Sequence, residues 1–139
     1  MSMIQREVIK LKFIDEEHKQ FLLKKFNDLD NNKKRDVYYL SLIYTLGICK
    51  ETRKHFEEIF EIGEGININS IHSPWQTDTS AKVTRMAFSL WNGCMYDSDD
   101  DRVNGKMSNY YNPSEIFCCS YAPYFYEAIK IRYPEYTGE

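Results

Sequence analysis

The chain has 139 residues and a formal net charge of −3, with 42% hydrophobic and 28% charged residues. This length suits one domain that buries a core without disulfides or metal ions, so we expect residues 1–139 to form a single domain. The acidic balance argues against direct nucleic-acid binding, which normally needs a basic surface. Because no apolar run approaches the roughly 18 residues of a membrane span and the start shows no secretory leader, we expect a cytoplasmic protein without a membrane partner.

Cysteine spacing and acidic spacing both argue against a metal site. The four cysteines, at positions 49, 94, 118 and 119, lack the paired CxxC spacing of a zinc ribbon, and we expect them to be reduced thiols. The runs 28–39 and 97–108 begin like calcium loops, but neither has the glycine at position six or the glutamate at position twelve that such loops require. We therefore expect no metal and no cofactor.

The first thirteen residues show only one weak pattern. Residues 10–13 (KLKF) alternate between polar and apolar, as in a short strand. A strand needs a partner, and none is evident nearby. We interpret this segment as an extended arm that packs on the body of the protein.

The next fifty residues predict three helices. Asp15 is placed to cap a helix over 15–29. A second helix over 37–46 is apolar around nearly its whole circumference, which is typical of a central, buried helix. The third helix runs over 51–62, with Gly63 as its stop.

The stretch 75–93 (WQTDTSAKVTRMAFSLWNG) contains the strongest helical pattern in the chain. Its apolar residues recur at helical spacing on one face, namely Val83, Met86, Ala87, Leu90 and Trp91. Hydroxyl and carboxylate side chains over 77–80 are placed to cap the helix start, and Gly93 is placed to end it.

The remaining segments complete a helical chain. The connection 63–74 has room for a brief extended piece at 66–68, and 94–111 is interpreted as a long loop. A short helix is expected from Asn112 to about residue 119, and a last helix over 123–132. The sum is an all-α domain of five or six helices.

The sequence carries no recognisable catalytic motif. It has no HExxH, no GxSxG, no P-loop and no GxGxxG, and its three histidines are scattered. We therefore expect that the protein is not an enzyme. A nucleophilic Cys49 or Cys94 beside a histidine in space stays a third, lesser hypothesis.

The first candidate surface is an acidic loop bordered by tyrosines. Carboxylates steer a partner with a basic groove, and aromatic rings supply contact area. A solvated loop without a partner is the simpler alternative. The candidate partner-binding residues are Tyr96, Asp97, Asp99, Asp100, Asp101, Tyr110 and Tyr111.

The second candidate is the start of the helix over 75–93. A helix N-terminus favours anions, hydroxyl and cationic side chains add to this, and Trp75 could stack on a base. Plain capping with Trp75 as a packing anchor is the structural alternative, and Asp78 would repel an anion. The candidate ligand-binding residues are Trp75, Gln76, Thr77, Thr79, Ser80, Lys82 and Arg85.

The block WQT..S.KVTR.AF.LWNG over 75–93, with the ending IKIRYPEY over 129–136, resembles a family of small uncharacterised proteins. These occur in clostridia and related Firmicutes, often on phages and other mobile elements. The resemblance covers most of the chain from about Phe13 onward and assigns chemistry to no residue. It implies a mobile-element protein of the kind that commonly serves as a stoichiometric inhibitor or accessory factor.

We thus expect a non-catalytic protein-binding factor, an inhibitor of a host protein or ribonucleoprotein complex such as CRISPR–Cas, hence an anti-CRISPR protein. The alternative is a small-ligand binder that sequesters a nucleotide-like anion at 77–85.

Overall fold

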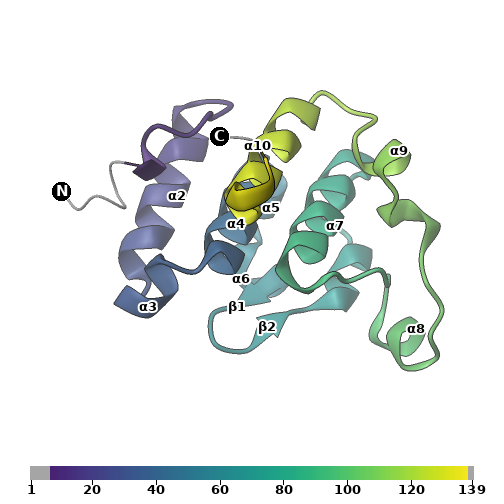
Figure 1. Ribbon diagram of the computed structural model, residues 1–139. Helices are drawn as coiled ribbons and strands as arrows, with labels where there is room; N and C mark the ends of the chain where they lie inside the picture. The colour runs from purple at the N-terminus through teal and green to yellow at the C-terminus, as the bar shows by residue number, and fades with distance from the viewer. Residues whose placement is uncertain (1–6, 138–139) are drawn as a thin grey trace.

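The computed structural model describes residues 7–137, which are mostly helical and form one compact domain (Figure 1). The longest helices of this range are α2 (Glu16–Asp28), α4 (Val37–Leu46), α7 (Asp78–Asn92) and α10 (Ala122–Arg132). Helix α4 contacts α2, α7 and α10 and so lies at the centre of the bundle. The prediction of an all-α fold is confirmed.

Helix α4 is buried because almost every residue on it is apolar. All six residues from Ser41 to Leu46 are buried. The Asp36 carboxylate caps its start by accepting a hydrogen bond from the Tyr38 amide at 2.8 Å. The one polar side chain in its last turn, Thr45, donates to the Ser41 carbonyl at 2.6 Å, so burial leaves it satisfied. The sequence predicted both the bounds and the central position of this helix.

Helix α2 packs on α4 and carries the cap that the sequence predicted. The Asp15 carboxylate accepts a hydrogen bond from the His18 amide at 2.8 Å. A short helix, α3 (Asn31–Lys34), follows, and Asp30 caps it in the same way.

The segment before α2 is held by side-chain hydrogen bonds instead of strand pairing. The Lys12 amide donates to the Glu127 carboxylate of α10 at 2.7 Å, and the Tyr44 hydroxyl donates to the Lys12 carbonyl. Val8 is buried against the core. Residues 10–13 are therefore a packed arm without strand geometry, and the first six residues of the predicted arm lie outside the described residues.

The predicted helix over 51–62 is interrupted at His55 and ends early, at Ile59. The structure has α5 (Lys50–Lys54), a break at His55, α6 (Phe56–Ile59) and then β1 (Phe60–Glu61). Strand β1 pairs antiparallel with β2 (Gly65–Ile66), with Phe60 opposite Ile66.

Tertiary contacts explain why this helix does not continue. Phe60 adopts extended geometry and buries its ring against Tyr39 and Trp91. Gly63 and Gly65 form the turn between the two strands with positive φ angles of 91° and 114°. Residues that carry a side chain rarely adopt this backbone conformation. The brief extended piece expected near 66–68 is present at Ile66 and Asn67 and ends there, because η1 (Ile68–His72) is a 3₁₀ helix.

Helix α7 matches its prediction closely. It ends at Asn92, and Gly93 follows with a left-handed φ of 72°. Its apolar face, which includes Val83 and Ala87 with no exposed surface, packs on α4.

The segment after α7 has more structure than the predicted loop. It contains α8 (Asp99–Val103), capped by Ser98, and η2 (Asn109–Tyr111). In Figure 1, α8 lies at the far end of a loop that extends away from the bundle. Next, α9 (Pro113–Ile116) begins at the predicted cap but ends earlier than expected, and α10 is followed by η3 (Pro134–Tyr136).

Candidate functional site

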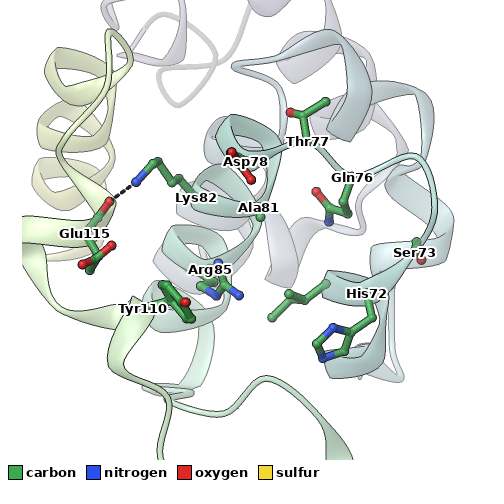
Figure 2. Close-up of a pocket in the computed structure, with 11 residues that line it drawn as sticks. His72, Ser73, Gln76, Thr77, Asp78, Ala81, Lys82, Arg85, Tyr110 and Glu115 are labelled. Carbon is green, nitrogen blue, oxygen red and sulfur yellow. Dashed lines mark hydrogen bonds between the residues drawn. The ribbon is translucent and has the colours of Figure 1, made fainter.

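Helix α7 borders an open hollow of about 600 Å³, which we call the α7 hollow (Figure 2). It runs along the side of the first half of the helix. Its walls come from η1, from α7 and from the segment that follows α8. The lining residues are Ile71, His72, Ser73, Gln76, Thr77, Asp78, Ala81, Lys82, Arg85, Tyr110 and Glu115.

Hydroxyls at the start of α7 are used for capping. The Thr77 side chain accepts a hydrogen bond from the Ser80 amide at 3.0 Å, and the Ser80 hydroxyl accepts one from the Thr77 amide at 2.8 Å. These reciprocal bonds form a capping box that satisfies amide groups at the helix start. An anion at the helix terminus would have to displace this cap.

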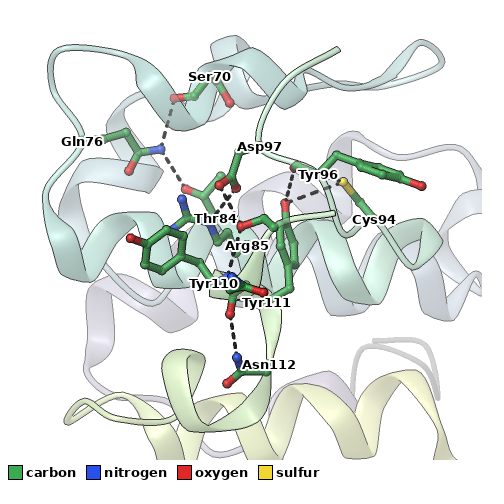
Figure 3. Close-up of polar contacts among 12 residues, drawn as sticks. Ser70, Gln76, Thr84, Arg85, Cys94, Tyr96, Asp97, Tyr110, Tyr111 and Asn112 are labelled. Atoms are coloured by element: carbon green, nitrogen blue, oxygen red, sulfur yellow. Dashed lines mark hydrogen bonds and ion pairs between the residues drawn. The ribbon is translucent and has the colours of Figure 1, made fainter. Parts of the chain in front are cut away.

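Gln76 is likewise committed to the fold. Its amide nitrogen donates to the Thr84 hydroxyl at 3.0 Å and to the Ser70 carbonyl at 3.3 Å (Figure 3). Its amide oxygen accepts from the Ser80 hydroxyl at 2.5 Å. Gln76 therefore joins η1 to α7.

Trp75 lies outside the lining of the α7 hollow. Its ring stacks on His55 with centroids 4.2 Å apart and planes 7° apart. Its indole N–H donates to the Glu58 carboxylate at 2.6 Å, and the Ser73 hydroxyl donates to the same oxygen at 2.7 Å. The hydrogen bond from Ser73 lowers the pKa of Glu58, and the hydrogen bond from Trp75 lowers it further. Trp75 thus anchors the connection before α7 to the α5–α6 break.

Arg85 and Asp97 form the ion pair that holds the later segment against α7. The Arg85 Nε donates to Asp97 Oδ1 at 2.9 Å, and the Ser108 hydroxyl donates to Asp97 Oδ2 at 2.8 Å (Figure 3). Both charged side chains are mostly buried, with 13% and 15% of their side-chain surface exposed. The Arg85 guanidinium also lies 4.9 Å from the centre of the Tyr110 ring.

Two further anchors hold the segment 94–111, which we call the projecting segment. The Ser108 amide donates to the Met95 carbonyl at 2.8 Å and so joins its two ends. The Asn69 side chain of η1 accepts from the Asp99 amide at 3.0 Å and donates to the Asp99 carboxylate at 3.2 Å. The segment is therefore tied to the body at its base and near its tip.

The Tyr111 side chain bonds to the backbone of Tyr96 within the projecting segment. The Tyr111 hydroxyl donates to the Tyr96 carbonyl at 3.0 Å and lies 3.6 Å from the Cys94 sulfur. Burial raises the pKa of Tyr111 above its ordinary value, so the phenol keeps its proton and remains a donor. Both tyrosines are half-buried and pack against the core.

The outward side chains of the projecting segment are charged and apolar, and the charges are of both signs because Arg102 and Lys106 are exposed as well. Asp99 and Asp100 are exposed, whereas Asp101 is half-buried. Among residues 7–137, nine large apolar or aromatic side chains are exposed, and four of them lie between 95 and 110. These four are Met95 (44% exposed), Val103 (74%), Met107 (61%) and Tyr110 (56%).

The structure therefore separates the predicted residues into two groups. Of the partner-binding set, Asp99, Asp100 and Tyr110 are on the outside, and Asp97 is an internal anchor. Of the ligand-binding set, Thr79 is exposed outside the lining, and only Lys82 and Arg85 bring positive charge to the α7 hollow.

Sequence reasoning missed three features of this region. The first is His72 of η1, which lines the α7 hollow. The other two are the exposed side chains of Val103 and Met107, in a stretch where the sequence interpretation considered mainly the acidic residues. The signal for the last two was present in the sequence, because two large apolar residues stand among the charged and small residues of 97–108.

The buried Cys49 thiol and the buried His18 ring both bond within the fold. The Cys49 sulfur lies 3.2 Å from the Thr52 hydroxyl, and burial raises the pKa of its thiol. The buried His18 bonds to the backbone at both ring nitrogens, to the Tyr44 carbonyl and the Ile14 amide. Across residues 7–137 no group of three His, Cys, Asp or Glu side chains is arranged to hold a metal ion.

These features define a small helical domain with a tethered projection, which exposes apolar and charged side chains, beside a polar hollow. The chain belongs to the family of unknown function DUF6075, whose model matches residues 8–139. No curated protein and no solved structure matches it in the comparisons. In the described part of the chain, no helix is both long enough and apolar enough to cross a bilayer.

Proposed function

We propose that this protein is a non-catalytic, cytoplasmic protein-binding factor that docks on its partner through the projecting segment. The observation that supports this most is the exposure of Val103 and Met107, at 74% and 61%, on a segment anchored to the body by internal bonds. Large apolar side chains cost free energy in water, and a protein interface buries them.

The chemistry of the partner follows from the charges beside these side chains. Asp99 and Asp100 are exposed one turn before Val103 on α8. Acids in that position steer a basic surface toward the segment, while the apolar side chains supply most of the binding free energy. Because Arg102 and Lys106 are exposed on the same segment, the partner surface is an apolar patch whose rim carries basic groups opposite these acids and acidic groups opposite these bases.

Anchoring of the segment favours tight binding. A loop that orders only on binding loses conformational entropy at that moment, and this reduces the affinity. Here the Asp97 ion pair and the Ser108–Met95 backbone bond order the segment beforehand.

The finer proposal is that the partner is a host defence complex, such as CRISPR–Cas, and that this protein inhibits it stoichiometrically. Its support is the resemblance of 75–93 to proteins carried on phages and other mobile elements of Firmicutes. An inhibitor that acts by docking needs an exposed surface, which the projecting segment provides.

The test compares a surface variant with a matched control. Val103→Asp/Met107→Asp places charge on the proposed surface, and Tyr126→Asp does the same at another exposed side chain, on α10. Wild type and the control should capture the same host protein from lysate and restore plaquing of a phage on CRISPR-immune cells. The double variant should keep its thermal midpoint and lose both properties. Equal capture by the folded double variant would refute the docking role.

The two parts of this proposal separate in the same experiment. Capture of a partner unrelated to defence, abolished by the double variant, would retain the docking function and reject the inhibitor. Restored plaquing by the double variant would reject the projecting segment as the inhibitory surface.

A further inference from the structure

The α7 hollow presents its positive charges from one side of α7. Lys82 and Arg85 are three residues apart and therefore share one face of the helix. In Figure 2, Arg85 lies between Tyr110 on one side and His72 of η1 on the other. The apolar side chains of Ile71 and Ala81 contribute to the same lining.

The Arg85 guanidinium is held in one orientation. The bond to Asp97 uses Nε, and the Tyr110 ring supports the guanidinium plane at 4.9 Å. With Nε engaged, the two Nη groups form the edge of the guanidinium that remains for an acceptor. An arginine held in this way has lost its rotamer freedom in advance and can bind both oxygens of an oxyanion together.

The remaining charges restrict the class of ligand. The Lys82 ammonium donates to the Glu115 carbonyl, a neutral acceptor. The carboxylates of Asp78 and Glu115 also line the α7 hollow, so it carries charge of both signs. A polyanion would meet repulsion, whereas a molecule with one anionic group and a neutral or cationic remainder would not.

We propose that the α7 hollow binds a small molecule through a single carboxylate or phosphate group, held by the Nη edge of Arg85 with Lys82 beside it. The volume of about 600 Å³ lies in the range of known small-molecule sites. This site is independent of partner docking. It also differs from binding at the helix terminus, where the capping box occupies the amides.

The experiment is an NMR titration of the ¹⁵N-labelled protein with inorganic phosphate, acetate, AMP and adenosine. Phosphate, acetate or AMP should shift the amides of residues 72 and 81–85 in a saturable way, and adenosine should not. Binding of inorganic phosphate or acetate with AMP excluded would identify a free oxyanion as the ligand. Tighter binding of AMP than of inorganic phosphate would identify the ligand as a phosphate group attached to a larger molecule.

Variants assign the effect to the guanidinium. Arg85→Lys keeps the positive charge that pairs with Asp97 but removes the two Nη groups of the guanidinium. It should weaken anion binding at least about tenfold. Lys82→Met should weaken it without touching the Asp97 anchor, and so decides the matter if Arg85→Lys does not fold. Lys24→Met, at an exposed position on α2, should bind as wild type does.

Three results would each overturn the proposal. The first is that none of the three anions produces a saturable shift. The second is that adenosine shifts the amides as much as AMP does. The third is that Lys82→Met and a folded Arg85→Lys both bind the anions with the affinity of wild type.

Discussion

The burial of His18 predicts a specific dependence of stability on pH. The side chain has no exposed surface, and burial lowers its pKa from 6.5 to about 4. The bond from the Ile14 amide to Nδ1, at 3.3 Å, requires a lone pair on that nitrogen. The bond between Nε2 and the Tyr44 carbonyl, at 2.8 Å, requires a proton on the other nitrogen. Both bonds are therefore made by one neutral tautomer.

The sign and the magnitude follow from linkage. The unfolded chain binds a proton at His18 near pH 6.5, before the folded protein does, so stability falls as the pH falls below 6.5. The loss is complete near the folded pKa of about 4. At about 1.4 kcal/mol for each pKa unit, the difference between the two values corresponds to about 3 kcal/mol.

The assay is urea unfolding of wild type and His18→Gln across this pH range. The variant should be less stable at neutral pH, because its amide replaces the ring imperfectly. Its free energy of unfolding should then decline by about 3 kcal/mol less than that of wild type between pH 6.5 and about 4. His72→Gln, at an exposed histidine, should follow wild type. Parallel curves for wild type and His18→Gln would refute the role of the buried ring.

Two further predictions concern backbone packing and the anchor of the projecting segment. A Cβ at Gly47 would lie 2.8 Å from the Phe21 ring, so Gly47→Ala should cost about 2 kcal/mol of unfolding free energy, and Gly47→Asn should cost more. At Gly93 a Cβ would meet no atom within 4 Å, but the residue has a φ of +72°, so Gly93→Ala should cost about 1 kcal/mol and Gly93→Asn less. Thermal or urea unfolding measures the effect at both glycines. A smaller loss of stability at position 47 than at position 93 would contradict the close packing around Gly47. Asp97→Ala removes the acceptor for Arg85 and Ser108, so it should cost about 2 kcal/mol of unfolding free energy and increase amide hydrogen exchange over 95–108. The control Asp100→Ala should cost less than about 1 kcal/mol. Equal exchange in these two variants would show that the ion pair does not order the segment.

The parts of the fold that the sequence predicted depend on chemistry within one element. Caps at Asp15, Asp36 and Asn112 act on amides two or three residues away, so their position in the sequence is sufficient to identify them. The apolar spacing of α7 and the apolar circumference of α4 are also local.

The misplaced helix over 51–62 depended on contacts from elsewhere in the chain. His55 stacks on Trp75, twenty residues later, and Phe60 packs on Trp91. Helical spacing of Phe56 and Ile59 continues through this region and conceals the break. Distant rings and the two glycines of the hairpin therefore override the local preference.

The candidate site was predicted in part for the same reason. Lys82 and Arg85 stand three residues apart on α7, so helical spacing places them on one face. The sequence could not distinguish Asp97, an anchor, from Asp99 and Asp100, which are exposed, because only the fold brings Arg85 within 2.9 Å of one of them. His72 and Tyr110 enter the lining from separate elements.

Photo-crosslinking from the projecting segment tests the central proposal most directly. Benzoylphenylalanine at position 107, in the purified and otherwise unaltered protein, should crosslink one host protein at equal stoichiometry, and the same group at position 126 should not. Crosslinking from position 126 with none from 107 would contradict docking through the projecting segment.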